Sequence, residues 1–181
     1  MEAPLIIQDS SVLLNLLATN RLDEIMRGVG RQTIVCREVT AELLYLRDFA
    51  TGERVAVNLT SFITAGVIIE TDFASPEEVE RFVEFAAALD DGEAASAAIA
   101  EIRHMELSTD ERKATKLLQS RGTISKLWTT PDLISAWASN SCPPKAILRE
   151  ALTRIQTCAR YIPPSGHPLK EWWQSILQST D

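Results

Sequence analysis

Short apolar runs alternate with segments of helical hydrophobic spacing through the first half of the chain. Residues 4–8 form an apolar run that ends at Asp9-Ser10-Ser11, and residues 12–17 form an apolar stretch typical of a buried helix. A second short helix is predicted over 21–29 and a second strand over 33–36. The pattern therefore predicts a β-α alternation from the N-terminus onward.

The next segments predict a third helix, a third strand and a fourth helix. Residues 37–48 place apolar side chains at Val39, Leu43 and Leu46, which predicts a helix, whereas residues 51–63 fit no single pattern. Residues 66–70 are short and β-branched, as in a strand. Ser75-Pro76-Glu77-Glu78 is a helix start with proline in the first turn. The positions expected to form the buried stripe of that helix are Val79, Phe82, Val83 and Phe85.

The second half continues the alternation and adds helices at its end. Residues 94–102 are rich in alanine, which predicts an interior helix that packs closely against its neighbours. The further expected elements are strands at 105–108 and 122–124 and helices at 110–120, 131–138 and 144–158. Strands that alternate with helices predict an α/β fold with a parallel sheet covered on both faces.

The chain is divided by one linker-like stretch, Pro163-Pro164-Ser165-Gly166-His167-Pro168. The expected organisation is a main domain over 1–162 and a C-terminal segment over 163–181. Trp172 and Trp173 give this segment an apolar surface that docks on the domain or on a partner.

Composition and charge limit the class of protein. The 181 residues suffice for one hydrophobic core, and no apolar run approaches the roughly 18 residues of a membrane span. Three well-separated cysteines and an N-terminus without a basic start predict a reduced cytoplasmic protein with no membrane contact. The net charge of -7 is unusual for a protein that binds nucleic acid by neutralising phosphates. An acidic nucleic-acid enzyme is expected to concentrate carboxylates around a metal ion.

Acidic residues follow the predicted strands at four places. Asp9 follows the first strand, Glu42 lies after the second, Glu93 opens the alanine-rich helix, and Asp110-Glu111 follow residues 105–108. Functional side chains of an open parallel sheet collect beyond the carboxyl ends of its strands. Carboxylates gathered there can hold one or two Mg²⁺ or Mn²⁺ ions for phosphodiester cleavage.

Each acid also has a structural interpretation. Asp9 is a normal helix N-cap, and the pairs Asp90/Glu93 and Ser108/Glu111 have capping-box spacing. Ser75/Glu78 has the same spacing without any suggested chemistry, so spacing alone does not identify a catalytic acid. Glu42 alone fits a solvated helix position.

Taken in order, these segments resemble a known family. Residues 5–13, with Asp9 and Ser11, are similar to the opening strand and helix of a PIN domain. Val39-Thr40-Ala41-Glu42-Leu43 resembles the helix that carries the second acid of that family. Asp91-Gly92-Glu93-Ala94 resembles the Gly-Glu-Ala helix of a PIN subgroup, and residues 108–114 resemble its Asp-Asp motif. Arg121-Gly122-Thr123-Ile124 falls where the subgroup has a Gly-Thr strand, so the resemblance covers residues 5–125.

The resemblance implies a three-layer α/β/α sandwich with a mostly parallel sheet and a metal-dependent endoribonuclease that cleaves single-stranded RNA. It implies Mg²⁺ or Mn²⁺ as cofactor, and an antitoxin protein and a homodimer as partners. Carried over by position, the catalytic and metal-binding residues are Asp9, Glu42, Glu93, Asp110 and Glu111, and Ser11 and Arg112 are expected to contact the substrate or to support the metal ligands. Glutamate at the third and fourth acidic positions and Cys36 in place of a frequent proline depart from the family pattern.

Two other interpretations remain open. A PIN-like scaffold with a weakened metal site would act as a protein-interaction module, because Mg²⁺ tolerates displaced ligands poorly. A different metal-dependent phosphatase or phosphotransfer fold ranks last, since no Asp-x-Asp follows the first strand. His104 and His167 lack a nucleophile at motif spacing, and no Gly-rich phosphate loop is present.

Overall fold

A parallel sheet forms the centre of the molecule in the computed structural model, which describes residues 3–42 and 44–179. Within these residues the sheet has five strands in the order β5-β2-β1-β6-β7. Their bounds are β1 (Leu5–Gln8), β2 (Gln32–Cys36), β5 (Ile68–Thr71), β6 (Glu106–Ser108) and β7 (Leu127–Trp128). All neighbouring pairs are parallel, as the β-α alternation predicts.

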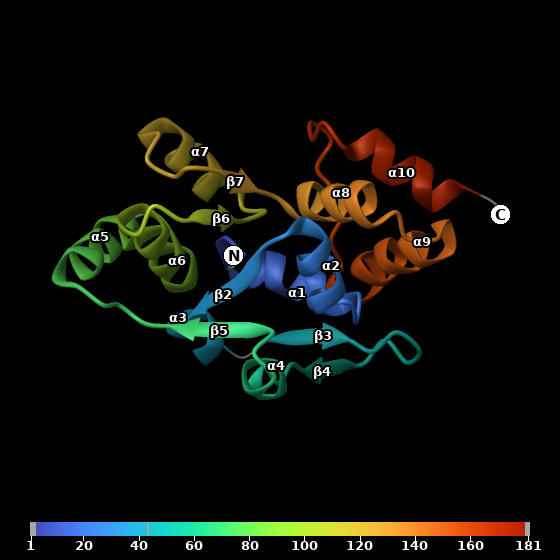
Figure 1. Cartoon of the computed structure of the whole chain (residues 1–181), viewed down its shortest axis with the longest axis horizontal. Helices are drawn as coiled ribbons and strands as arrows, with labels where there is room; N and C mark the ends of the chain where they lie inside the picture. The colour runs from blue at the N-terminus through green and yellow to red at the C-terminus, as the bar shows by residue number, and fades with distance from the viewer. Residues whose placement is uncertain (1–2, 43, 180–181) are drawn as a thin grey trace.

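Helices cover both faces of this sheet, so the fold is the expected α/β/α sandwich (Figure 1). The α-helices are α1 (Ser10–Ala18), α2 (Leu22–Val29), α3 (Arg37–Ala41), α4 (Thr60–Thr64), α5 (Pro76–Ala86), α6 (Asp91–Ile102), α7 (Arg112–Arg121), α8 (Thr130–Ser141), α9 (Lys145–Arg154) and α10 (Lys170–Gln178). A π-helical turn, η1 (Ile155–Ala159), continues α9. Helix α6 contacts β1, β2 and β6 and supports α5, whereas α1, α2 and α8 pack together on the other side.

The alanine-rich helix α6 lies in the interior, as predicted. Its alanines at 94, 95, 97, 98 and 100 are fully buried. Small side chains let this helix approach three strands and α5 closely. The N-terminus of α6 is thereby held firmly over the carboxyl end of the sheet.

The helix predicted over 37–48 is much shorter than expected. Helix α3 ends at Ala41, and Glu42 already has an extended backbone. Strand β3 (Tyr45–Arg47) instead pairs antiparallel with β4 (Arg54–Ala56) through a turn in which Asp48 accepts hydrogen bonds from two backbone N–H groups. Pairing with the next strand of the chain therefore overrides the local helical spacing. The predicted apolar position Leu43 lies outside the described residues.

The strand predicted at 122–124 is also wrong. Gly122 has a φ of 66° and ends α7 in the left-handed conformation, which suits glycine after a helix. Thr123 then donates a hydrogen bond of 2.5 Å from its hydroxyl to Glu101 Oε2. The last strand of the sheet begins only at Leu127.

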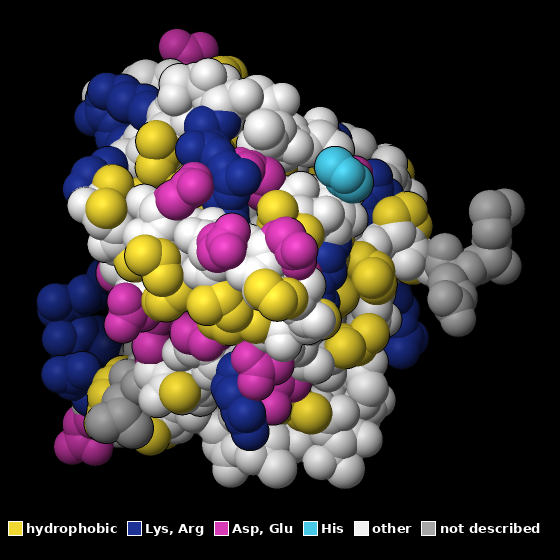
Figure 2. Space-filling model, turned by 90° about the vertical axis from the view of Figure 1, so that its left-hand side faces the viewer, with side chains coloured by type: hydrophobic (Ala, Val, Ile, Leu, Met, Phe, Trp, Pro, Cys, Tyr) yellow, Lys and Arg dark blue, Asp and Glu magenta, His cyan; other side chains and the backbone are white. Residues whose placement is uncertain are grey.

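The buried stripe of α5 differs from the prediction. Phe85 is buried, but Val79 and Val83 are 45% and 64% exposed. Figure 2 shows hydrophobic side chains between acidic ones on the face of the molecule that includes α5. Glu78 occupies an inward position, where its carboxylate accepts a hydrogen bond of 2.7 Å from Arg103 Nε. A buried acid within the stripe conceals its period from a hydrophobicity pattern.

Helix α10 packs against α9 and buries Trp173 completely. The Trp173 ring meets the ring of Tyr161 edge to face, with centroids 6.1 Å apart. No helix among residues 3–42 and 44–179 combines the length and the hydropathy needed to cross a bilayer.

Candidate acidic site

The central strand β1 brings three chain segments to one edge of the sheet. It lies between β2 and β6, and all three strands are parallel. Asp9 follows β1 directly, and its N–H donates to the carbonyl of Ser108, the last residue of β6, at 3.2 Å. The residues after β1, β2 and β6 are therefore neighbours, as expected for carboxyl ends of parallel strands.

Asp9 is buried and only half satisfied. Its Oδ1 atom caps α1 and accepts hydrogen bonds from Ser11 N, Ser11 Oγ and Val12 N at 2.9, 2.7 and 3.1 Å. Its Oδ2 atom is buried and accepts no hydrogen bond from the described residues. Burial raises the pKa of Asp9 to about 6, although the neighbouring Thr109 hydroxyl and the Ser11 hydroxyl that is bonded to Oδ1 oppose this rise. Asp9 thus fulfils the capping interpretation and still keeps one carboxylate oxygen without a partner.

Glu93 shares an acidic surrounding with Asp9. Its backbone N–H donates to the N-cap Asp90 at 2.9 Å, so the capping interpretation holds here for the backbone. Partial burial and then the negative charges of Asp90, Asp9 and Glu111 raise the pKa of the Glu93 carboxyl to about 7. Asp9 and Glu93 also line the same small pocket with Thr109. Carboxylates after β1, in the first turn of α6 and in the β6–α7 loop therefore lie close together.

Asp110 and Glu111 differ in their surroundings. The Asp110 carboxylate accepts hydrogen bonds from Thr130 N (2.9 Å), Thr130 Oγ1 (2.5 Å), Asn15 Nδ2 (2.9 Å) and Tyr161 OH (3.0 Å). Burial raises its pKa despite these bonds. Glu111 is exposed, and none of the described residues donates to its side chain. The inner acid of the pair is thus saturated by protein donors, and the outer one is free to meet a ligand.

The predicted capping box of Ser108 and Glu111 does not form. Ser108 lies in β6, where its hydroxyl contacts the carbonyl of Ile7 at 3.5 Å. Helix α7 begins only at Arg112, with Glu111 itself at the N-cap position and without a side-chain cap. The capping interpretation of Glu111 is therefore wrong.

Glu42 approaches the site from α3, although its residue is exposed as a whole. A β-carbon at Gly92 would collide with Glu42 Oε1, so the carboxylate lies against the first turn of α6. Partial burial raises the pKa of Glu42, and the charges of Asp90 and Asp91 add to this effect while the Ser10 hydroxyl opposes it. The missing side chain of Gly92 therefore leaves room for Glu42 to lie close to α6.

The two predicted supporting residues both lie near Asp110. Ser11 Oγ donates to Asp9, as above, and accepts from the backbone N–H of Asp110 at 3.4 Å. Arg112 is exposed at the start of α7 and lines a cavity together with Asp110. Ser11 links the two inner acids, and Arg112 adds a positive charge next to them.

The hydrogen-bond donors around Asp110 were not predicted from the sequence. Asn15 gave one usable signal, an amide inside the apolar helix α1, where a buried polar group needs a partner. Thr130 and Tyr161 gave none, because they reach Asp110 from segments after the last predicted strand.

The chemical nature of the side chains in this site suits a divalent cation, but among the described residues their arrangement does not yet form a complete set of metal ligands. All its acids offer hard oxygen ligands, and the unpartnered Oδ2 atom of Asp9 gains an interaction when a cation binds. In the described part of the chain, however, no three Asp, Glu, His or Cys side chains are placed so that they hold one ion together. Metal binding here requires side-chain adjustment, above all of the exposed Glu111 and Glu42.

A comparison with protein-family models matches residues 5–125 of the chain to the PIN domain. A comparison with curated proteins and one with solved structures gave no significant match. The matched segment spans about two thirds of the chain and contains all five predicted acids. Thr130 and Tyr161 lie outside it.

Proposed function

The chain belongs to the PIN-domain family, and from this premise we propose that it is a metal-dependent endoribonuclease acting on single-stranded RNA. PIN domains are generally nucleases, so the family supports phosphodiester hydrolysis. The observation that carries the proposal is the buried Asp9 carboxylate with its unpartnered Oδ2 atom, next to a Glu93 whose pKa is raised by neighbouring acids. Such a concentration of unfavourable negative charge is characteristic of functional sites.

The residues best placed to hold the cation are Asp9, Glu93 and Glu111. Their charges already influence one another, and Asp9 and Glu111 have carboxylate oxygens without protein donors. Glu42 borders this group at the start of α6, and Asp110 supports it from the interior. A bound Mg²⁺ or Mn²⁺ supplies positive charge that offsets the charge developing on the phosphate during cleavage.

The protein itself contributes positioning and proton control. Four hydrogen-bond donors hold the Asp110 carboxylate in place and so fix the loop between β6 and α7. The same bonds fix the backbone from which the side chain of Glu111 extends. In the metal-free protein, Glu93 with a pKa of about 7 exchanges a proton near neutral pH. Arg112 at the rim attracts the phosphate backbone of the substrate.

The test is cleavage of a fluorescent single-stranded RNA by the purified chain, first in EDTA and then with Mg²⁺ or Mn²⁺ added. Cleavage is expected only with metal, and Asp9→Asn is expected to lower the rate by about 100-fold or more. Glu80→Gln is the matched control, since Glu80 is an exposed acid on α5, and it should leave the rate unchanged. Equal rates for wild type and Asp9→Asn, at equal folding, would refute the proposal.

The absence of three converging ligands in the described residues favours a second candidate, a PIN-like scaffold that acts as a protein-interaction module. This candidate predicts no Mg²⁺ or Mn²⁺ binding in titration calorimetry and no metal-dependent cleavage. Saturable binding of either ion that is lost in Asp9→Asn favours the nuclease.

A toxin role in a toxin and antitoxin pair is a further part of the proposal. A toxic nuclease should arrest growth when expressed in bacteria, and Asp9→Asn should relieve the arrest. Growth arrest by both forms alike would separate toxicity from the acidic site.

A further inference from the structure

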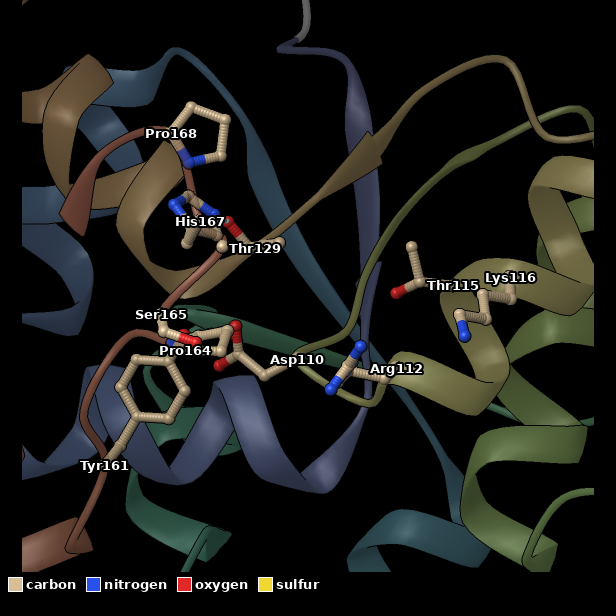
Figure 3. Close-up of a pocket in the computed structure, with 11 residues that line it drawn as sticks. Asp110, Arg112, Thr115, Lys116, Thr129, Tyr161, Pro164, Ser165, His167 and Pro168 are labelled. Carbon is tan, nitrogen blue, oxygen red and sulfur yellow. Dashed lines mark hydrogen bonds between the residues drawn. The ribbon is translucent and has the colours of Figure 1, made fainter.

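A cavity of about 410 Å³ lies beside the acidic site and is built largely by residues after the family segment. Figure 3 shows Asp110 between two groups of side chains: Arg112, Thr115 and Lys116 of α7 on one side, and the segment from Tyr161 to Pro168 on the other. The volume of the cavity falls in the range of about 300–1,000 Å³ that is typical of pockets for small organic ligands. The cavity therefore has room for a ligand next to the proposed cleavage site.

The wall from the C-terminal segment is apolar and held in place. Tyr161 is fixed at both ends, by its hydroxyl bond to Asp110 and by the ring of the buried Trp173. Pro164 and Pro168 add stiff apolar rings. A wall that is ordered before binding lowers the entropic cost of holding a flat ligand.

His167 belongs to the same wall, and its ring orientation is also determined. Its Nδ1 atom accepts a hydrogen bond from the N–H of Leu169 at 3.1 Å, so in the neutral ring the proton lies on Nε2. Nε2 then donates to Thr129 Oγ1 at 2.9 Å, and that hydroxyl donates to Asp132 Oδ2 at 2.6 Å. Both ring nitrogens are hydrogen-bonded within the protein. His167 therefore offers a ligand the face of its ring in a fixed orientation.

The opposite wall is cationic. Arg112 and Lys116 are one helical turn apart on α7, both line the cavity, and both are exposed. Among the described residues neither forms an ion pair with a carboxylate. Two unpaired cations at the rim of an apolar cavity match a ligand with an anionic end and a flat apolar end.

We infer that this cavity binds one nucleotide unit of the RNA strand, with the base against Tyr161 and the proline wall and the phosphate at Arg112 and Lys116. The inference rests on the proposed nuclease function, because it places that nucleotide beside the phosphate to be cut. It also assigns a role to residues 161–168: they form a substrate subsite that lies outside the segment shared with the family.

The test measures binding of nucleoside 5′-monophosphates to the full chain in EDTA, by titration calorimetry and by chemical-shift changes of Tyr161 and His167. At least one of AMP, GMP, CMP and UMP is expected to bind about tenfold more tightly than ribose 5-phosphate or inorganic phosphate. The double variant Arg112→Ala/Lys116→Ala should weaken that binding about tenfold. Equal affinity for all these phosphates would overturn the inference, since it would reduce the site to two surface cations.

Two further variants control for charge and for the cavity. Lys113→Ala/Lys145→Ala removes the same net charge from exposed positions that do not line the cavity, and it should keep the affinity within about twofold. Ser165→Trp fills the cavity from an exposed position and should abolish nucleotide binding at an unchanged melting temperature. Retained nucleotide binding in Ser165→Trp, or equal losses in the two double variants, would refute the subsite.

Binding in EDTA also separates this inference from the nuclease proposal. Asp9→Asn should abolish cleavage and leave nucleotide binding intact. Cleavage by the wild type without any nucleotide binding refutes the subsite alone, whereas nucleotide binding without metal-dependent cleavage refutes the nuclease alone.

Discussion

The hydroxyl of Tyr161 donates a hydrogen bond of 3.0 Å to Oδ1 of Asp110, an acid of the family segment. Tyr161 itself follows helix α9 and the π-helical turn η1, well beyond the matched residues 5–125. The C-terminal part of the chain therefore completes the surroundings of an acid that the family segment supplies. Changes in this part should be felt at the site.

Tyr161→Phe should lower the free energy of unfolding by about 1–2 kcal/mol, because the half-buried Asp110 carboxylate loses one donor while the ring contact with Trp173 remains. Urea unfolding at pH 7 measures this. Tyr45→Phe is the matched control, since Tyr45 is 38% exposed and its hydroxyl forms no hydrogen bond to the described residues. Equal changes in the two variants would contradict a specific role of the Tyr161 hydroxyl.

Asp9→Asn should change how stability depends on pH in the metal-free protein. The pKa of Asp9 rises from 3.8 to about 6 on folding, so the native state binds the proton more tightly than the unfolded state. Asp9 therefore lowers the unfolding free energy of the wild type as pH rises from about 4 to about 6, and the Asn variant lacks this contribution of Asp9. The difference between the two proteins should change by roughly 2–3 kcal/mol across that range, as linkage requires.

Urea unfolding of both proteins in EDTA at several pH values tests this expectation. Any loss of hydrogen bonds in the Asn variant adds a constant offset, which leaves the slope with pH untouched. Parallel curves for the two proteins between pH 4 and 7 would show that Asp9 is not destabilised by burial.

Much of this fold was predictable because local patterns and tertiary structure agree. The strand before Asp9, the helix start at Ser75 and the interior alanine helix each have a pattern that needs no distant partner. The order of the acids in the chain also gave the family, which the match over residues 5–125 confirms. The relative positions of the acidic side chains could not be predicted in this way, because they depend on how the elements pack in the folded chain.

The errors occurred where a contact with residues outside the segment decides its local structure. Residues 45–47 form a strand because residues 54–56 pair with them, and no local pattern reports that partner. The inward side of α5 was misjudged because Glu78 is neutralised by Arg103 from the end of another helix. The saturation of Asp110 depends on Thr130 and Tyr161, whose proximity exists only in the folded chain.

Trp173→Ala should cost about 3–5 kcal/mol of unfolding free energy, as expected when a fully buried tryptophan is truncated. Trp172→Ala is the matched control, because the side chain of Trp172, the residue before Trp173, is only partly buried. Its truncation should cost clearly less. Chemical unfolding of the isolated chain compares the two. Similar small effects would mean that α10 is not anchored on this chain through Trp173.

Gly92→Ala should reveal the contact between Glu42 and α6. Alanine within a helix is normally more stable than glycine by about 1 kcal/mol, but a β-carbon here collides with Glu42 Oε1 and approaches Val39 Cγ2 to 3.2 Å. In the wild type we therefore expect Gly92→Ala to be neutral or destabilising, and in the Glu42→Ala background we expect it to become more favourable by about 1 kcal/mol or more. The double-mutant cycle, measured by urea unfolding, gives this coupling directly. An additive cycle would place the Glu42 carboxylate away from the first turn of α6 and remove it from the candidate site.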